Sequence, residues 1–124
     1  MGKLLFDEPS LTVSPSLAVI VGLEEAIVLQ QVKYWLTINK EKKANYFNGR
    51  YWVYNSYREW QKQFPFWSER TVRRIIGRLE SHGLLISDNH NEAGFDKTKW
   101  YTIDYEELAR CEAAHKAMEE TDAG

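Results

Sequence analysis

Cysteine, long apolar runs and a secretion signal are scarce or missing in this chain of 124 residues. Its only cysteine, Cys111, excludes an internal disulfide bond. The longest apolar runs, such as Leu17–Val21, are far too short to cross a bilayer, and residues 1–10 lack the charged and then apolar plan of a signal peptide. We therefore expect a cytoplasmic protein without membrane contact. At 44% hydrophobic, the chain can form one domain around its own core.

Sequence signatures of catalysis and cofactor binding are missing as well. The chain has no phosphate-binding loop of the GxxxxGK[ST] type and no Cys-x-x-Cys pair. Cys111 and His115 have the i, i+4 spacing of two metal ligands, but two ligands on a polar helix are a weak signal. We therefore expect a protein that is not an enzyme and that has no cofactor and no metal.

The formal net charge of −2 conceals an uneven distribution along the chain. Residues 1–49 hold five basic and five acidic residues, residues 50–99 hold nine and six, and residues 100–124 hold two and seven. The balances are therefore 0, +3 and −5. Because a basic face can meet phosphate even on an acidic protein, the middle segment is where we expect a polyanion to bind.

Capping residues predict the helices of the chain. Ser14-Pro15 predicts a helix start and Gly22 its end, after which we expect a longer helix over residues 23–39. Ser56, with Glu59 three residues on, predicts a capping box, and the helix it starts ends at Phe64 before a proline. The next helix runs from a cap at residue 68 to residue 83, and the last from a cap at residue 104 to about residue 119.

Between these helices we expect short strands and polar loops. The predicted strands cover residues 51–54, 84–86 and 99–103, and the predicted loops cover residues 40–48 and 88–97. Two short helices at a sharp turn, followed at once by a two-stranded hairpin, are typical of a winged helix-turn-helix, in which the hairpin loop is the wing. The fold class we predict is therefore α+β, mostly helical: a winged helix-turn-helix with an extra N-terminal helix and a C-terminal helix.

The domain boundaries follow from these elements. We expect an N-terminal arm over residues 1–13, the winged-helix domain over 14–108, and an acidic C-terminal helix and tail over 109–124.

The helix over residues 23–39 has an unusually wide apolar arc. Only Ala26, Gln30, Lys33 and Thr37 form a clearly non-apolar stripe on its helical wheel. The arc fits a central core helix, and it also fits a helix that gives part of its surface to a homodimer contact.

The helix after Ser68 has one apolar stripe and one basic face. Its apolar residues have the spacing i, i+3, i+4, i+7. They are Val72, Ile75, Ile76 and Leu79. Opposite them lie Arg70, Arg74, Gly77 and Ser81, with Arg73 and Arg78 on the flanks. An arginine fork can bind a guanine edge or a phosphate, so this face is typical of a helix that enters the major groove; the alternative is a solvated face paired with Glu69 and Glu80.

Other candidate contacts surround this basic helix. Arg58 and Tyr57 lie on the preceding helix, which usually crosses the phosphate backbone. Lys97 and Lys99 lie on the predicted wing, although Asp88, Glu92 and Asp96 reduce its positive charge. We expect the aromatic residues at the bend to pack in the core rather than to stack on bases. They are Trp60, Phe64 and Trp67.

These residues also carry a family resemblance. The run YWVYNSYREWQKQFPFWSERTVRRIIGRLESHGLL, followed by FDKTKWYTIDYEEL, resembles the winged-helix domain of replication proteins from phages and plasmids of Gram-positive bacteria. The opening LTVSPSLAVIVGLEEAIVLQQVKYWL is similar too, so the resemblance covers about residues 10–108. It implies DNA contacts at Ser68, Arg70, Thr71, Arg73, Arg74 and Arg78, with wing contacts near Lys97 and Lys99.

The family also implies a function and partners. Its domain often stands ahead of a DnaD-like C-terminal domain, binds origin DNA and helps to recruit the replicative helicase. We therefore expect sequence-specific binding of double-stranded DNA in replication initiation, with contacts to replisome proteins that would need a C-terminal domain beyond this sequence. The alternatives are a small winged-helix transcriptional regulator and a winged helix that binds a protein.

Overall fold

Serine caps begin three of the helices in the computed structural model, which describes residues 10–123. Helix α2 (Pro15–Val21) begins after Ser14, whose Oγ accepts a hydrogen bond from the backbone N–H of Leu17. Helix α4 (Tyr57–Gln63) begins with the capping box of Ser56 and Glu59, and α5 (Glu69–Ser81) begins after Ser68. Each cap accepts a backbone N–H that the first helical turn leaves free, so the sequence signal is local, and all three predicted starts are confirmed.

The two long helices extend further than expected. Helix α3 (Leu23–Lys42) ends three residues beyond the predicted helix, and α6 (Tyr105–Ala123) ends four residues beyond it. The carboxylate of Asp104 caps α6 by accepting the backbone N–H of Glu107 at 3.0 Å, as predicted. Gly22, at φ 103°, joins α2 to α3 with a bend of 118°. No single helix among residues 10–123 is long and apolar enough to span a bilayer, although the bent α2–α3 pair reaches that length and composition.

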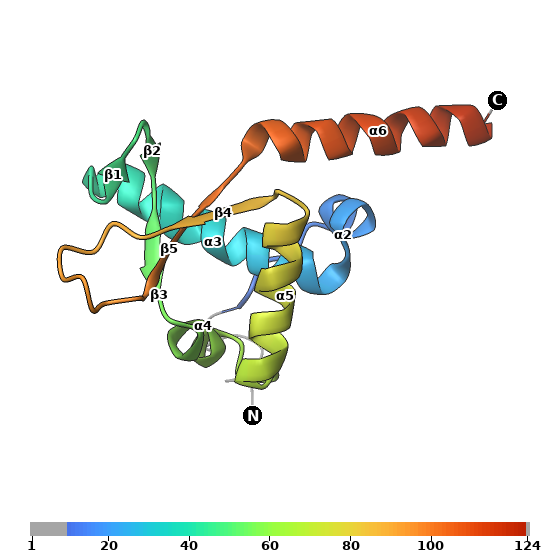
Figure 1. Cartoon of the computed structure of the whole chain (residues 1–124). Helices are drawn as coiled ribbons and strands as arrows, with labels where there is room; N and C mark the ends of the chain where they lie inside the picture. Colours follow the sequence, from blue (N-terminus) through green and yellow to red (C-terminus); the bar gives the residue numbers. More distant parts are fainter. Residues whose placement is uncertain (1–9, 124) are drawn as a thin grey trace.

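Two small antiparallel sheets complete the α+β fold, which is mostly helical, with five helices in the described residues. Strands β1 (Tyr46–Phe47) and β2 (Arg50–Tyr51) form a hairpin, and β3 (Val53–Asn55), β4 (Leu85–Asp88) and β5 (Lys99–Ile103) form a sheet in the order β3-β5-β4. In its register Val53 lies opposite Tyr101, and Leu85 lies opposite Ile103. Figure 1 shows α4 and α5 beside this sheet and the loop between β4 and β5 extending away from it.

The predictions for residues 40–54 are wrong in part. The expected loop contains the last turn of α3 and strand β1, and the expected strand is divided between β2 and β3. Trp52 divides it because its side chain is buried and its indole N–H donates to the carbonyl of Phe47 at 2.9 Å. Its backbone N–H donates to Asn45 rather than to a sheet partner.

The core lies where α3 packs against α5 and strands β3 and β5. The four apolar residues of α5 are buried, as their spacing predicts. Of the aromatic residues at the bend, Trp60 and Phe64 are buried as expected, and Trp67 is half-buried against the core. The helical wheel is wrong about Ala26, which it places on the polar stripe of α3 and which is fully buried. Leu23 and Tyr34 lie on the exposed side of α3, and a homodimer contact there stays a prediction.

Candidate nucleic-acid interface

A buried aromatic turn fixes α5 relative to α4. Phe64 is fully buried, and its ring lies 5.5 Å from that of Trp67. The backbone N–H of Trp67 donates to the carbonyl of Phe64, and the Gln61 side chain donates to the carbonyl of Trp67 at 3.1 Å. These contacts close the turn from both sides, so the N-terminus of α5 has a fixed direction.

The first turn of α5 presents polar and basic groups to solvent. The hydroxyl of Ser68 donates to that of Thr71 at 3.1 Å and accepts the Thr71 backbone N–H at the same distance. Arg70 is exposed and forms no ion pair with any residue in the range 10–123. The helix N-terminus adds a partial positive charge to this end, which favours an anion there.

Arg73 leans toward α4. Its guanidinium lies 4.5 Å from the centre of the Tyr57 ring, and its contact with Glu69 is long, at 3.7 Å. Its side chain remains 62% exposed, so both contacts orient the guanidinium without covering it. A cation over an aromatic face is stabilised by roughly 0.5–1 kcal/mol at exposed sites.

Arg74 and Arg78 point to the start of α3 instead. A nitrogen of Arg74 lies 3.2 Å from the Glu24 carboxylate, and one of Arg78 lies 2.8 Å from that of Glu25. The Glu25 side chain is only 7% exposed, so Arg78 balances a charge that water scarcely reaches. Arg74 and its partner are both more than a third exposed, so an exchange of partners costs Arg74 little.

The sequence predicts Lys99 on an exposed wing, but its side chain is partly buried between β5, α4 and α5. Its ammonium donates to Glu80 and to the Tyr57 hydroxyl, each at 2.9 Å. Partial burial lowers the pKa of Lys99, but the hydrogen bonds to Tyr57 and Glu80 outweigh it, and the net pKa is raised. Lys99 therefore stays charged and ties β5 to α4 and α5, which leaves it and the Tyr57 hydroxyl poorly placed to meet a ligand.

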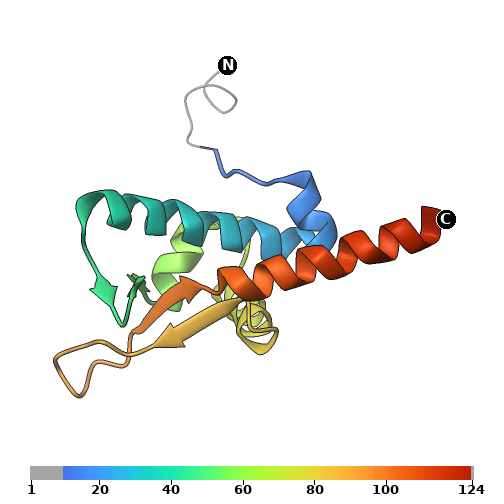
Figure 2. The same ribbon diagram turned by 90° about the horizontal axis from the view of Figure 1, so that it is seen from above.

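The remaining candidate cations are Arg58 and Lys97. Both are exposed, and neither forms an ion pair within the described part of the chain. Arg58 lies on α4, next to Tyr57 in the sequence. Lys97 lies in the loop between β4 and β5, and Figure 2 shows this loop and α5 on the side of the molecule away from α3.

Gly77 leaves the exposed face of α5 open. A Cβ added there would have no neighbour within 4 Å, so no packing contact inside the protein requires a glycine. Glu24 and Glu25, which pair with Arg74 and Arg78, are not predicted from the sequence as part of this surface. Two acids in the first turn of a helix are common because of the helix dipole, so no local signal indicates that they face another helix.

Comparison of the chain with protein-family models, with curated proteins and with solved structures finds no match. The resemblance to replication proteins therefore stays a prediction made from the residues themselves.

Proposed function

We propose that this protein binds double-stranded DNA through a winged helix-turn-helix in which α4 and α5 are the two helices and α5 enters the major groove. The order of its elements and the β3-β5-β4 sheet are compatible with that fold. By the resemblance, the domain binds the replication origin of a phage or plasmid. The alternative of a transcriptional regulator would use the same chemistry at a different DNA site.

The observation that carries this proposal is the first half of α5. It combines an exposed arginine that has no acidic partner in the described residues, a second arginine held over Tyr57, and a serine-capped helix N-terminus. An arginine there can bind a guanine edge, while the capping hydroxyls and backbone N–H groups can bind phosphate. We assign the strongest contacts to Arg70 and Arg73, with Ser68 and Thr71 beside them.

Arg74 has a conditional role in this proposal. Its guanidinium contacts Glu24 in the free protein, so a DNA phosphate or base must compete with that carboxylate. Arg78 is assigned a structural role because Glu25, its partner, is buried.

Fluorescence anisotropy on duplex DNA across a salt series tests the proposal. We expect the affinity to fall steeply as salt rises, because bound cations release counterions from the duplex. Arg70→Ala should weaken binding by about 1–3 kcal/mol if it reads a base. Arg110→Ala is the matched control, because it removes the same charge from α6, where the side chain is 73% exposed. The proposal would be refuted if the affinity did not depend on salt concentration, or if Arg70→Ala and Arg110→Ala lowered the affinity equally.

Glu24→Gln tests the competition at Arg74. The substitution frees the guanidinium, so we expect the affinity for duplex DNA to rise roughly two- to five-fold, the scale of an exposed ion pair. Glu112→Gln, on exposed α6, changes the net charge equally and should leave the affinity nearly unchanged.

A further inference from the structure

The loop between β4 and β5 exposes a large aromatic side chain. Phe95 is 89% exposed, more than any other described large hydrophobic residue. It lies in a turn in which the backbone N–H of Asp96 donates to the carbonyl of Ala93 at 3.0 Å. An exposed phenylalanine contributes no burial to the stability of the fold, so its presence here points to contact with another molecule.

The loop is held in shape by its own side chains. The Asn91 amide donates to the carbonyls of Asp96 and Thr98, at 3.1 and 2.8 Å, and its oxygen accepts the indole N–H of Trp100. The Tyr54 hydroxyl donates to the Asp96 carboxylate at 3.0 Å. Because these hydrogen bonds hold the turn in one shape, the Phe95 ring has a defined position in which it is exposed to solvent.

The charge around Phe95 is of the wrong sign for DNA. Residues 88–98 contain three acidic residues and one basic residue, a balance of −2. The backbone N–H of Thr98 keeps the pKa of the Asp96 carboxyl below its usual range, so that carboxylate stays charged. An exposed aromatic ring among carboxylates fits an apolar cavity with a basic rim better than it fits a phosphate backbone.

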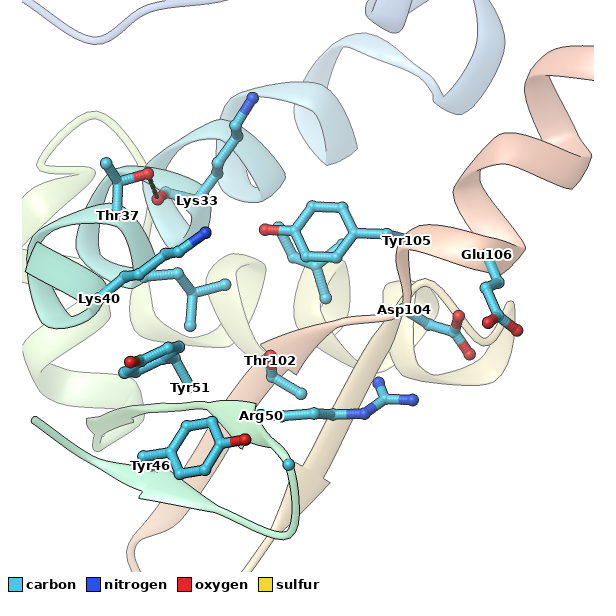
Figure 3. A pocket seen from close by; sticks show the side chains of 13 residues that line it. Lys33, Thr37, Lys40, Tyr46, Arg50, Tyr51, Thr102, Asp104, Tyr105 and Glu106 are labelled. Atoms are coloured by element: carbon cyan, nitrogen blue, oxygen red, sulfur yellow. Dashed lines mark hydrogen bonds between the residues drawn. The ribbon is translucent and has the colours of Figure 1, made fainter. Parts of the chain in front are cut away.

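This chain contains such a cavity. It has a volume of about 590 Å³ and lies between the C-terminal half of α3, the β1–β2 hairpin and the start of α6 (Figure 3). Leu36, Tyr51 and Ile103 line it, and Lys33 and Lys40 extend from α3 on one side. Arg50 also lines the cavity, and its guanidinium extends toward the side of Asp104 (Figure 3). The two carboxylates of the lining, Asp104 and Glu106, lie together at the start of α6, where Asp104 is already used as a helix cap.

We propose that Phe95 of one copy of this protein inserts into this cavity of a second copy. The ring contacts the aromatic and aliphatic lining, while the carboxylates of Glu92 and Asp96 face Lys33 and Lys40. The contact joins two unlike surfaces, because the loop and the cavity belong to different parts of the fold. A single loop buries a small area, so the association is weak and becomes appreciable when copies are concentrated, for example along one DNA.

Sedimentation of the full chain without DNA tests this contact. The wild type should associate at high protein concentration, and Phe95→Ala should weaken the association about tenfold or more, as expected for a buried aromatic anchor. The double substitution Lys33→Glu and Lys40→Glu should weaken it as well. Met118→Ala, which removes another exposed apolar side chain, should leave it unchanged. A wild type that stays monomeric, or Phe95→Ala that associates normally, overturns the proposal.

Mixing the two defective proteins separates a direct contact from a folding defect. Phe95→Ala retains the cavity, and the lysine double variant retains the loop, so an equimolar mixture should form dimers at a protein concentration at which each variant alone is monomeric. A mixture that stays monomeric overturns the proposal. The result does not depend on DNA binding, and DNA binding can fail while the association holds. If Phe95→Ala instead weakens only the binding of duplex DNA, the ring contacts DNA and this inference is wrong.

Discussion

Helix α5 and the loop between β4 and β5 differ in what surrounds their cations. On α5, Arg70 has no acidic partner within the described chain, and Arg73 is oriented by an aromatic ring while staying exposed. In the loop, Lys97 follows the charged carboxylate of Asp96, and Lys99 at its base is already bound to Glu80. A lysine or arginine is therefore most available to a polyanion where no carboxylate pairs with it and none lies beside it in the sequence.

The same contrast divides α5 along its length. The arginines near its N-terminus lie on open surface, whereas Arg74 and Arg78 lie against the first turn of α3. Gly22 lies just before this turn, with φ at 103°, and a Cβ there would lie 2.5 Å from an oxygen of Glu25. The absence of a side chain at Gly22 therefore leaves room for the carboxylate that Arg78 binds.

Arg78→Ala should have the largest effect among the substitutions that test this difference between the two halves of α5. The substitution leaves the Glu25 carboxylate buried without its cation, so we expect the free energy of unfolding to fall by about 2 kcal/mol. Urea denaturation followed by tryptophan fluorescence measures it. A second substitution, Glu25→Gln, should recover part of the loss. If Arg78→Ala leaves stability unchanged but abolishes DNA binding, Arg78 belongs with Arg70 and the division is wrong.

Gly77→Ala tests the open face of α5. We expect it to change the free energy of unfolding by less than Arg78→Ala does, and in the opposite direction. An alanine has room there and favours the helix, so we expect the free energy of unfolding to rise by about 1 kcal/mol. If the groove wall approaches this face closely, the added methyl group should at the same time weaken DNA binding. A variant with higher stability and unchanged affinity would place the DNA away from Gly77.

The sequence predicts most of what is local in this structure. A capping serine acts on an N–H two or three residues away, so Ser14, Ser56 and Ser68 identify their helices without knowledge of the fold. The mostly helical α+β class and the buried stripe of α5 follow from similar short-range patterns. The pairing of Glu25 with Arg78 joins residues 53 positions apart, and nothing near either residue predicts it.

The sequence also fails to predict burial on the side of a helix that is expected to be polar. A helical wheel assigns Ala26 to the polar stripe because the other residues on that stripe are polar. Ala26 is nevertheless buried, because α2 and α5 pack against α3, and a helical wheel contains no information about neighbouring helices. Trp52 shows the same limit. Its residue type favours a strand, yet the buried indole and its hydrogen bond to Phe47 interrupt the pairing there.

Lys97→Ala should have the smallest effect on DNA binding, and it tests whether the loop contacts DNA as α5 does. If the acidic residues of the loop keep it away from phosphate, the affinity for duplex DNA should change by less than about twofold, and the salt slope should stay the same. Arg58→Ala, which removes one charge from exposed α4, is the matched variant and should lower that slope by about 1. Equal losses of slope from the two variants would mean that the loop contacts the DNA backbone despite its net negative charge, and that its lysine outweighs the carboxylates beside it.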